Sequence, residues 1–132
     1  MEIETESSSF RDPSGFVFYH EKTCYRQINP AYKETYNYLI DSGLYKRLVN
    51  EELLIPHETK DDTYFQSLNK FLIIQPKPIP FVSYPYEWCF TQLKCAAQVT
   101  LAIMKHALNH GMILKDANAY NIQLFQRLCP RW

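Results

Sequence analysis

A stretch near the C-terminal end of the chain has the spacing of one long amphipathic helix, and this feature constrains the fold most. It starts at Tyr84-Pro85-Tyr86-Glu87, because proline fits the first helical turn and glutamate there faces the positive end of the helix dipole. Gly111 provides the stop. The apolar stripe consists of Leu93, Ala97, Leu101, Met104 and Leu108, widened by Phe90, Ala96, Val99 and Ile103. We predict a helix from 84 to about 110 with this stripe in the core.

The sequence before this helix indicates a mixture of short strands and helices. Aromatic and β-branched runs predict strands, while an Asn-Pro pair predicts the start of a helix. The expected elements are a disordered tail over 1–9, a turn over 11–15, a hairpin of strands 16–19 and 24–28, a helix from Asn29-Pro30 to Gly43, a helix over 44–50 reaching toward 54, a polar loop over 57–62, a strand over 70–75 and a short strand over 81–83. We therefore expect an α+β fold, with one domain over residues 10–132.

Charge and length exclude several classes of protein. The chain has 132 residues, enough for one domain with a core. Its 14 Lys and Arg balance its 14 Asp and Glu, so it lacks the clustered positive charge that nucleic acid or anionic lipid would require. No stretch has the uninterrupted apolar length of a membrane span. We therefore expect no nucleic-acid partner and no membrane partner.

The cysteines and the first residues bear on the compartment. Residues 1–9 are acidic and serine-rich, unlike the positive and apolar regions of a signal peptide. None of the four cysteines forms a Cys-x-x-Cys pair, and we expect reduced thiols at Cys24, Cys89, Cys95 and Cys129. These features predict a cytoplasmic protein.

Aromatic residues make up 15% of the chain, which leaves two interpretations. Tyrosine rings can fill a core while their hydroxyl groups stay hydrated. Alternatively, exposed aromatic side chains form a surface that docks on another domain.

Asp116 and Asn121 have the spacing of the protein-kinase catalytic loop, H-R-D-x-x-x-x-N. In that loop the Asp accepts the hydroxyl proton of the substrate and the Asn holds a metal ion. The order of elements fits as well, since a long helix and a short apolar run precede the pair. However, Leu114 and Lys115 stand where the loop has His and Arg. The alternative is that both side chains cap and brace a turn.

The other parts of a phosphotransferase are weakly represented. The three glycines never cluster, so neither a phosphate-binding loop nor a glycine-rich turn for S-adenosylmethionine is present. Arg26 is the only cation in the hairpin strands that could take the place of the nucleotide-binding lysine, with Glu34 as its possible partner. His106 and His110 are four residues apart, but Ala107 follows where a metalloprotease has its glutamate. We predict no metal site.

Several strings together carry a family resemblance. They are F-R-D-P-S-G-F-V-F at 10–18, Y-R-Q-I-N-P-A-Y at 25–32, S-G-L-Y at 42–45, L-L-I-P-H-E at 53–58, I-P-F-V-S-Y-P-Y-E-W-C-F-T-Q-L-K at 79–94 and H-G-M-I-L-K-D-A-N-A-Y-N-I-Q at 110–123. The chain resembles the N-terminal, kinase-like region of bacterial class I S-adenosylmethionine-dependent methyltransferases of the nodulation-protein type. The resemblance implies a partial kinase-like fold in which Asp116 and Asn121 occupy the catalytic-loop positions.

The sequence departs from that family pattern after Asn121. The resemblance implies an acidic residue on the next strand, whereas residues 124–132 contain none. We therefore expect a truncated kinase-like domain with an inactive Asp116, no cofactor, and the role of a non-catalytic remnant or accessory module. Its expected partners are a methyltransferase domain or a second copy of itself.

Two alternatives remain open. One is a nucleotide-binding, phosphotransferase-like fragment that holds magnesium-ATP through Asp116 and Asn121, with Lys115 and Arg26 as further contacts. The other is a protein-interaction domain that uses an aromatic surface.

Overall fold

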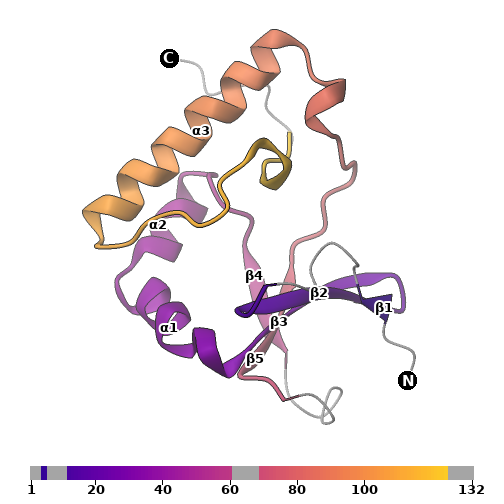
Figure 1. The fold of residues 1–132 in the computed structure, drawn as a ribbon, viewed down its shortest axis with the longest axis vertical. Coiled ribbons are helices and arrows are strands. Elements are labelled where there is room, and N and C mark those ends of the chain that lie inside the picture. The colour runs from indigo at the N-terminus through magenta and orange to yellow at the C-terminus, as the bar shows by residue number, and fades with distance from the viewer. Residues whose placement is uncertain (1–3, 6–11, 61–68, 125–132) are drawn as a thin grey trace. The chain divides into compact units, whose positions relative to one another are not determined.

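The computed structural model describes residues 4–5, 12–60 and 69–124. The chain divides into two compact units, the first formed by residues 1–45 and 55–78 and the second by residues 46–54 and 79–132. The fold is mixed α+β, as the sequence predicts (Figure 1).

The first unit contains a five-stranded sheet with the order β1-β2-β3-β5-β4. Its strands are β1 (Glu4–Thr5), β2 (Gly15–His20), β3 (Thr23–Ile28), β4 (His57–Lys60) and β5 (Leu72–Pro76). All neighbouring strands are antiparallel. Most of the expected tail over 1–9 lies outside the described residues, but Glu4 and Thr5 pair with β2.

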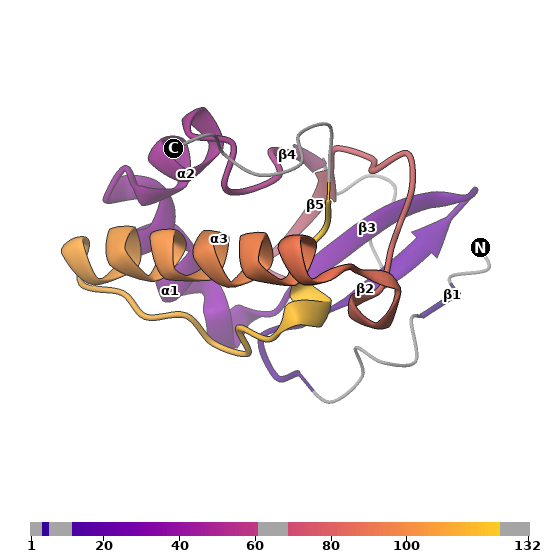
Figure 2. The same ribbon diagram turned by 90° about the horizontal axis from the view of Figure 1, so that it is seen from above.

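The predicted hairpin is confirmed. β2 and β3 pair from Gly15↔Ile28 to His20↔Thr23. Figure 2 shows them as two neighbouring, twisted strands. Glu21 and Lys22 form the turn with positive φ angles of 47° and 63°. That is the conformation whose twist matches paired strands, although Asn-Gly is the usual sequence there.

The sheet has a small core on each face, because neighbouring residues of a strand point to opposite sides. Phe18 and Ile73 are fully buried together on one face. Ile28 and Ile74 pack with Tyr36 on the other. Tyr36 comes from α1 (Lys33–Asp41), which follows a 3-10 turn, η2 (Pro30–Tyr32). Helix α1 therefore packs against the sheet through the Tyr36 ring.

Asn29 does not cap this helix through its side chain as the sequence predicts. Its side chain donates to the Pro13 carbonyl at 3.1 Å instead, and its backbone N–H donates to Ser14 O at 2.9 Å. Asn29 therefore ties the end of β3 to the turn before β2.

The prediction of a polar loop over 57–62 is wrong for residues 57–60, because β4 pairs with β5 along His57–Lys60. Residues 61 and 62 lie outside the described residues. Backbone pairing produces this strand even though its sequence, His-Glu-Thr-Lys, lacks apolar alternation. The hydroxyl of Tyr45 also accepts from the His57 N–H at 3.0 Å. β4 is an edge strand, where polar side chains are tolerated.

The structure confirms the limits of one of the next two predicted helices and changes the start of the other. α2 (Leu44–Asn50) has the predicted limits. The long helix, in contrast, begins at Phe90 rather than at Tyr84, giving α3 (Phe90–Asn109) after a separate 3-10 turn, η4 (Pro85–Glu87). The predicted strand over 81–83 does not form.

Trp88 explains the break before α3. Its backbone is extended, with φ −87° and ψ 141°, and its buried indole N–H donates to Ser83 Oγ at 2.9 Å. Each side of the break has its own helix start, since Glu87 accepts from the Tyr84 N–H and Gln92 accepts from the Cys89 N–H, both at 2.8 Å. The chain therefore has two successive helix starts, at Tyr84 and at Cys89, where the sequence analysis predicts a single one at Tyr84.

The prediction that the apolar stripe of this helix faces the core is wrong. Leu93, Leu101 and Leu108 are exposed, whereas Cys95, Ala96 and Ala107 are buried. Periodicity identifies an apolar side of a helix but does not show which side the rest of the fold covers.

The cysteine prediction is also corrected. Cys24 and Cys89 take part in no disulfide, in agreement with the prediction, whereas Cys95 is disulfide-bonded. Cys129 lies outside the described residues. No helix of the described ranges has the length and apolar character needed to cross a bilayer.

Candidate functional site

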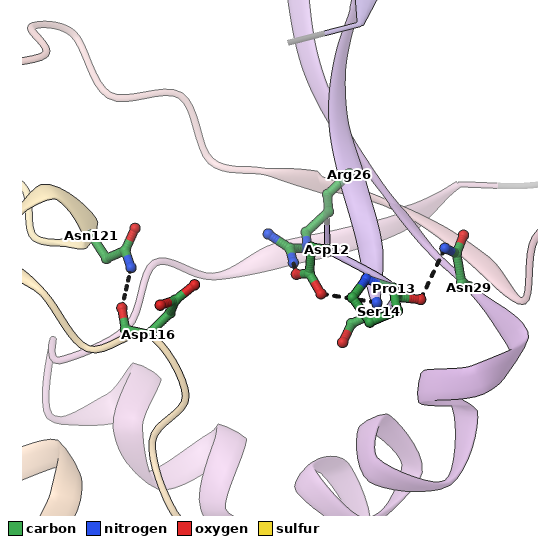
Figure 3. A network of polar contacts seen from close by, with 7 residues as sticks. All are labelled: Asp12, Pro13, Ser14, Arg26, Asn29, Asp116 and Asn121. Atoms are coloured by element: carbon green, nitrogen blue, oxygen red, sulfur yellow. Dashed lines mark hydrogen bonds and ion pairs between the residues drawn. The ribbon is translucent and has the colours of Figure 1, made fainter. Parts of the chain in front are cut away.

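The Asp116–Asn121 loop of the second unit is a compact turn closed by its own asparagines. Asp116 has a positive φ of 56°, and its carbonyl oxygen accepts from the Asn118 N–H at 2.9 Å. The side-chain amide of Asn121 donates to the same carbonyl (Figure 3). The two predicted site residues are therefore joined by a bond to the backbone carbonyl of Asp116, and the charged carboxylate of Asp116 is not involved.

Asn118 is the residue of this loop that sequence reasoning missed. Its Oδ1 accepts from the Tyr120 N–H at 2.9 Å and caps the 3-10 turn η5 (Ala119–Asn121). Asn121 N–H then donates to Asn118 O at 3.1 Å. An Asx cap of this kind is a local signal, since asparagine two residues before a backbone donor commonly forms it.

The end of the loop is fixed by Gln123, which the sequence gives no reason to select. Its Oε1 accepts from the Ser83 N–H at 3.0 Å, and its Nε2 donates to Ser83 O at 3.1 Å. Ser83 in turn holds the indole of Trp88. This pair of bonds joins residues 40 positions apart, which only the folded chain brings together.

The carboxylate of Asp116 takes no part in these bonds. The side chain is exposed, and none of the described residues donates a hydrogen bond to it. The bracing of the turn comes from Asn118, Asn121 and the backbone bonds of the loop, not from this carboxylate. Lys115, which precedes it, is exposed as well.

Arg26, the predicted stand-in for a nucleotide-binding lysine, belongs to the first unit. It forms an ion pair with Asp12 at 3.2 Å rather than with Glu34 (Figure 3). Asp12 also accepts from the Ser14 N–H at 2.9 Å, so it organises the turn before β2. This pairing gives Arg26 a role in holding the N-terminal turn to β3.

His57 and two tyrosines form a second polar cluster in the first unit. The Tyr36 hydroxyl lies 2.9 Å from His57 Nε2, and the Tyr45 ring lies 4.7 Å from the imidazole. Burial lowers the pKa of His57 and raises the pKa of Tyr36, the latter with a further contribution from Tyr45. The cluster favours a neutral imidazole that accepts from the Tyr36 hydroxyl.

His106 of α3 pairs with a carboxylate. Its Nε2 lies 2.8 Å from Glu51, which also binds Arg47 Nε at 2.9 Å. His110 Nδ1 lies 2.8 Å from the His106 carbonyl oxygen. Within the described ranges, no three His, Cys, Asp or Glu side chains gather as metal ligands.

The chain is similar to a curated protein. Nodulation protein NoeA of Rhizobium meliloti (strain 1021) is 31% identical to it over 119 residues, which cover 89% of the chain and 25% of NoeA. The chain therefore spans about a quarter of the length of the curated relative it matches. No family model matches the chain. No solved structure matches it either.

This match confirms the coarser part of the resemblance, a distant similarity to a nodulation protein. The kinase-like fold and the methyltransferase class stay predictions. The roles predicted for Asp116, Asn121, Lys115 and Arg26 also stay predictions.

Proposed function

We propose that this chain is a non-catalytic accessory module of a longer, methyltransferase-type protein. Two points support the proposal. The similarity to NoeA runs through 89% of the chain yet takes up 25% of NoeA, so in that relative the matching segment is one part of a much larger polypeptide. The family resemblance of the sequence adds the methyltransferase class.

The observation that carries the non-catalytic role is the use of Asn121. In phosphotransferases of the kinase type, the loop asparagine holds a metal ion. Here its amide group donates to the backbone carbonyl of Asp116 and closes the turn. Asn118 caps the same turn. The side chains of both asparagines bond to the backbone of the loop. This use of the asparagines supports a structural role for the loop.

A second function has one observation in its favour. The Asp116 carboxylate is exposed and is not used by the turn, and the Asn121 amide keeps an oxygen that can face a cation. The alternative proposal is therefore a nucleotide-binding fragment that takes magnesium-ATP at this loop, with Lys115 as a further contact.

Thermal unfolding with added ligand separates the two proposals. A ligand that binds only the native state raises its stability by about 2.7 kcal/mol at a hundred times its Kd. We expect neither magnesium-ATP nor S-adenosylmethionine to change the melting temperature of the chain. A shift with magnesium-ATP that disappears in Asp116→Asn would establish the alternative. A saturable shift with S-adenosylmethionine would contradict the accessory role.

A further inference from the structure

Helix α3 has apolar side chains on two sides, of which the fold covers one. The buried positions are Cys95, Ala96 and Ala107. A different side presents exposed apolar residues: Phe90 at 81%, Leu93 at 41%, Leu101 at 69% and Leu108 at 58% exposure, with Ala97 exposed among them. We call these five residues the outer stripe. A helix that is apolar on more than one side normally has a partner on each.

The spacing of the outer stripe is that of a helix–helix seam. Its positions, 90, 93, 97, 101 and 108, follow intervals of three, four, four and seven residues, which keep the side chains in line along a straight helix. Ala97 stands near its centre, where a small side chain lets a second helix approach closely. A partner helix laid along α3 would meet one continuous row of apolar side chains.

Charge distinguishes one border of this stripe. Lys94 and Lys105 are both exposed, and their separation of eleven residues, about three turns, places them on the same border. No Asp or Glu occurs between Glu87 and Asp116, although the whole chain has equal numbers of acidic and basic residues. The border is therefore positive.

We propose that the outer stripe binds an amphipathic helix of another protein segment, one whose apolar side is bordered by Asp or Glu. Leu93, Leu101 and Leu108 would enter its apolar side, and its carboxylates would face Lys94 and Lys105. This inference rests on the proposed accessory role and names the surface through which the module acts.

Two other occupants fit the stripe less well. A second copy packed antiparallel would set the lysine border of one α3 against the lysine border of the other, which is repulsive. An anionic membrane gains about 1 kcal/mol per nearby cation, and this border supplies only two lysines. Charge complementarity thus favours an acidic helix.

A pair of designed peptides tests the proposal on the full chain. Both peptides carry one leucine stripe on a 21-residue helix, bordered by glutamate in the first and by lysine in the second. Fluorescence anisotropy with labelled peptides measures their affinities. We expect saturable binding of the glutamate peptide and at least tenfold weaker binding of the lysine peptide.

Three variants locate the binding surface. Leu101→Gln should weaken the glutamate peptide about tenfold or more, the loss expected for one buried leucine. Ile113→Gln is the matched control, since Ile113 is 74% exposed but lies outside α3, and it should bind like wild type. In Lys94→Glu/Lys105→Glu the preference should reverse toward the lysine peptide. All four substituted positions are exposed, and circular dichroism checks that each variant is folded.

Several outcomes would overturn the proposal. Among them are no saturable binding of the glutamate peptide, equal binding of both peptides, and equal losses in Leu101→Gln and Ile113→Gln. Binding to phosphatidylserine vesicles without peptide binding would assign the stripe to a membrane. Sedimentation showing a dimer that Leu101→Gln abolishes would assign it to a second copy. The melting-temperature test of the proposed function concerns ligand binding at the Asp116–Asn121 loop, whereas the peptide test concerns the outer stripe. Either proposal can therefore fail while the other holds.

Discussion

At the scale of single residues, backbone conformation explains the candidate loop better than charge does. Asp116 adopts a left-handed φ of 56°, a region that aspartate, asparagine and glycine tolerate and alanine disfavours. The Asn118 N–H and the Asn121 side-chain amide both donate to its carbonyl oxygen. The identity of this residue therefore affects stability through φ, while its carboxylate faces solvent.

A series at Asp116 tests this account. We expect Asp116→Gly and Asp116→Asn to keep the stability of wild type, because both residues accept positive φ. Asp116→Ala should lose about 1 kcal/mol. Urea unfolding measures the three differences. A variant order in which alanine is as stable as glycine would contradict the conformational explanation.

His57 gives the second residue-scale prediction, a dependence on pH. Burial lowers its pKa in the folded protein, so the unfolded chain, with a pKa of about 6.5, binds a proton more readily. The contribution of His57 to stability is therefore complete above about pH 6.5 and is lost as the pH falls below it.

The measurement compares wild type with His57→Gln in urea between pH 7.5 and 5.5. The stability advantage of wild type should shrink as the pH decreases, because only wild type has the depressed imidazole. His20→Gln serves as the control variant. An advantage that stays constant or grows toward low pH would refute the assignment.

At the scale of elements, close backbone approach fixes the start of the β2–β3 hairpin. A Cβ atom on Gly15 would lie 1.9 Å from the carbonyl oxygen of Gln27, and Gln27 is held by its pairing with Ile73 on β5. The pairing of β2 with β3, and of β3 with β5, therefore limits position 15 to glycine. Gly43, which ends α1, has φ +80° and open space around it.

Alanine at these two glycines should act by different mechanisms. Gly15→Ala must push β2 away from β3, at a cost of about 1–3 kcal/mol. Gly43→Ala meets only the left-handed φ penalty of about 1 kcal/mol. Hydrogen exchange should show faster exchange of hairpin amides in Gly15→Ala alone. Equal hairpin protection in both variants would argue against the steric mechanism.

At the scale of the whole molecule, charge balance dominates colloidal behaviour. The formal net charge is zero at pH 7, and the isoelectric point is about 6.9. Molecules without net charge repel each other least, and this chain also carries exposed apolar side chains on α3.

We therefore expect the solubility of the chain to be lowest near pH 6.9 and to rise toward pH 8.5. The fraction remaining in solution after centrifugation, measured across that range at one ionic strength, checks this. Leu101→Gln should raise solubility at every pH, while Lys94→Gln should shift the minimum to lower pH. A minimum that does not follow the charge change would contradict the charge argument.

Local signals in the sequence determined much of the first unit and the helix α2. The hairpin, α1 with its Gly43 stop, α2 and β5 follow from residue type and short-range spacing, because turn conformation and helix ends depend on neighbours in the chain. The spacing of Asp116 and Asn121 likewise located the loop, since the two residues lie within one turn.

Only the tertiary structure decided the rest. β4 is a strand because β5 pairs with it, and α3 starts late because the indole of Trp88 binds Ser83. Gln123 reaches Ser83 across 40 positions, a contact that no local pattern encodes. The apolar period of α3 was clear, but which side is buried depends on what packs there. The hydrophobic effect is non-directional, so the sequence of a helix does not specify which of its apolar sides is buried. In the folded chain Cys95, Ala96 and Ala107 are buried, and the leucines of α3 are exposed.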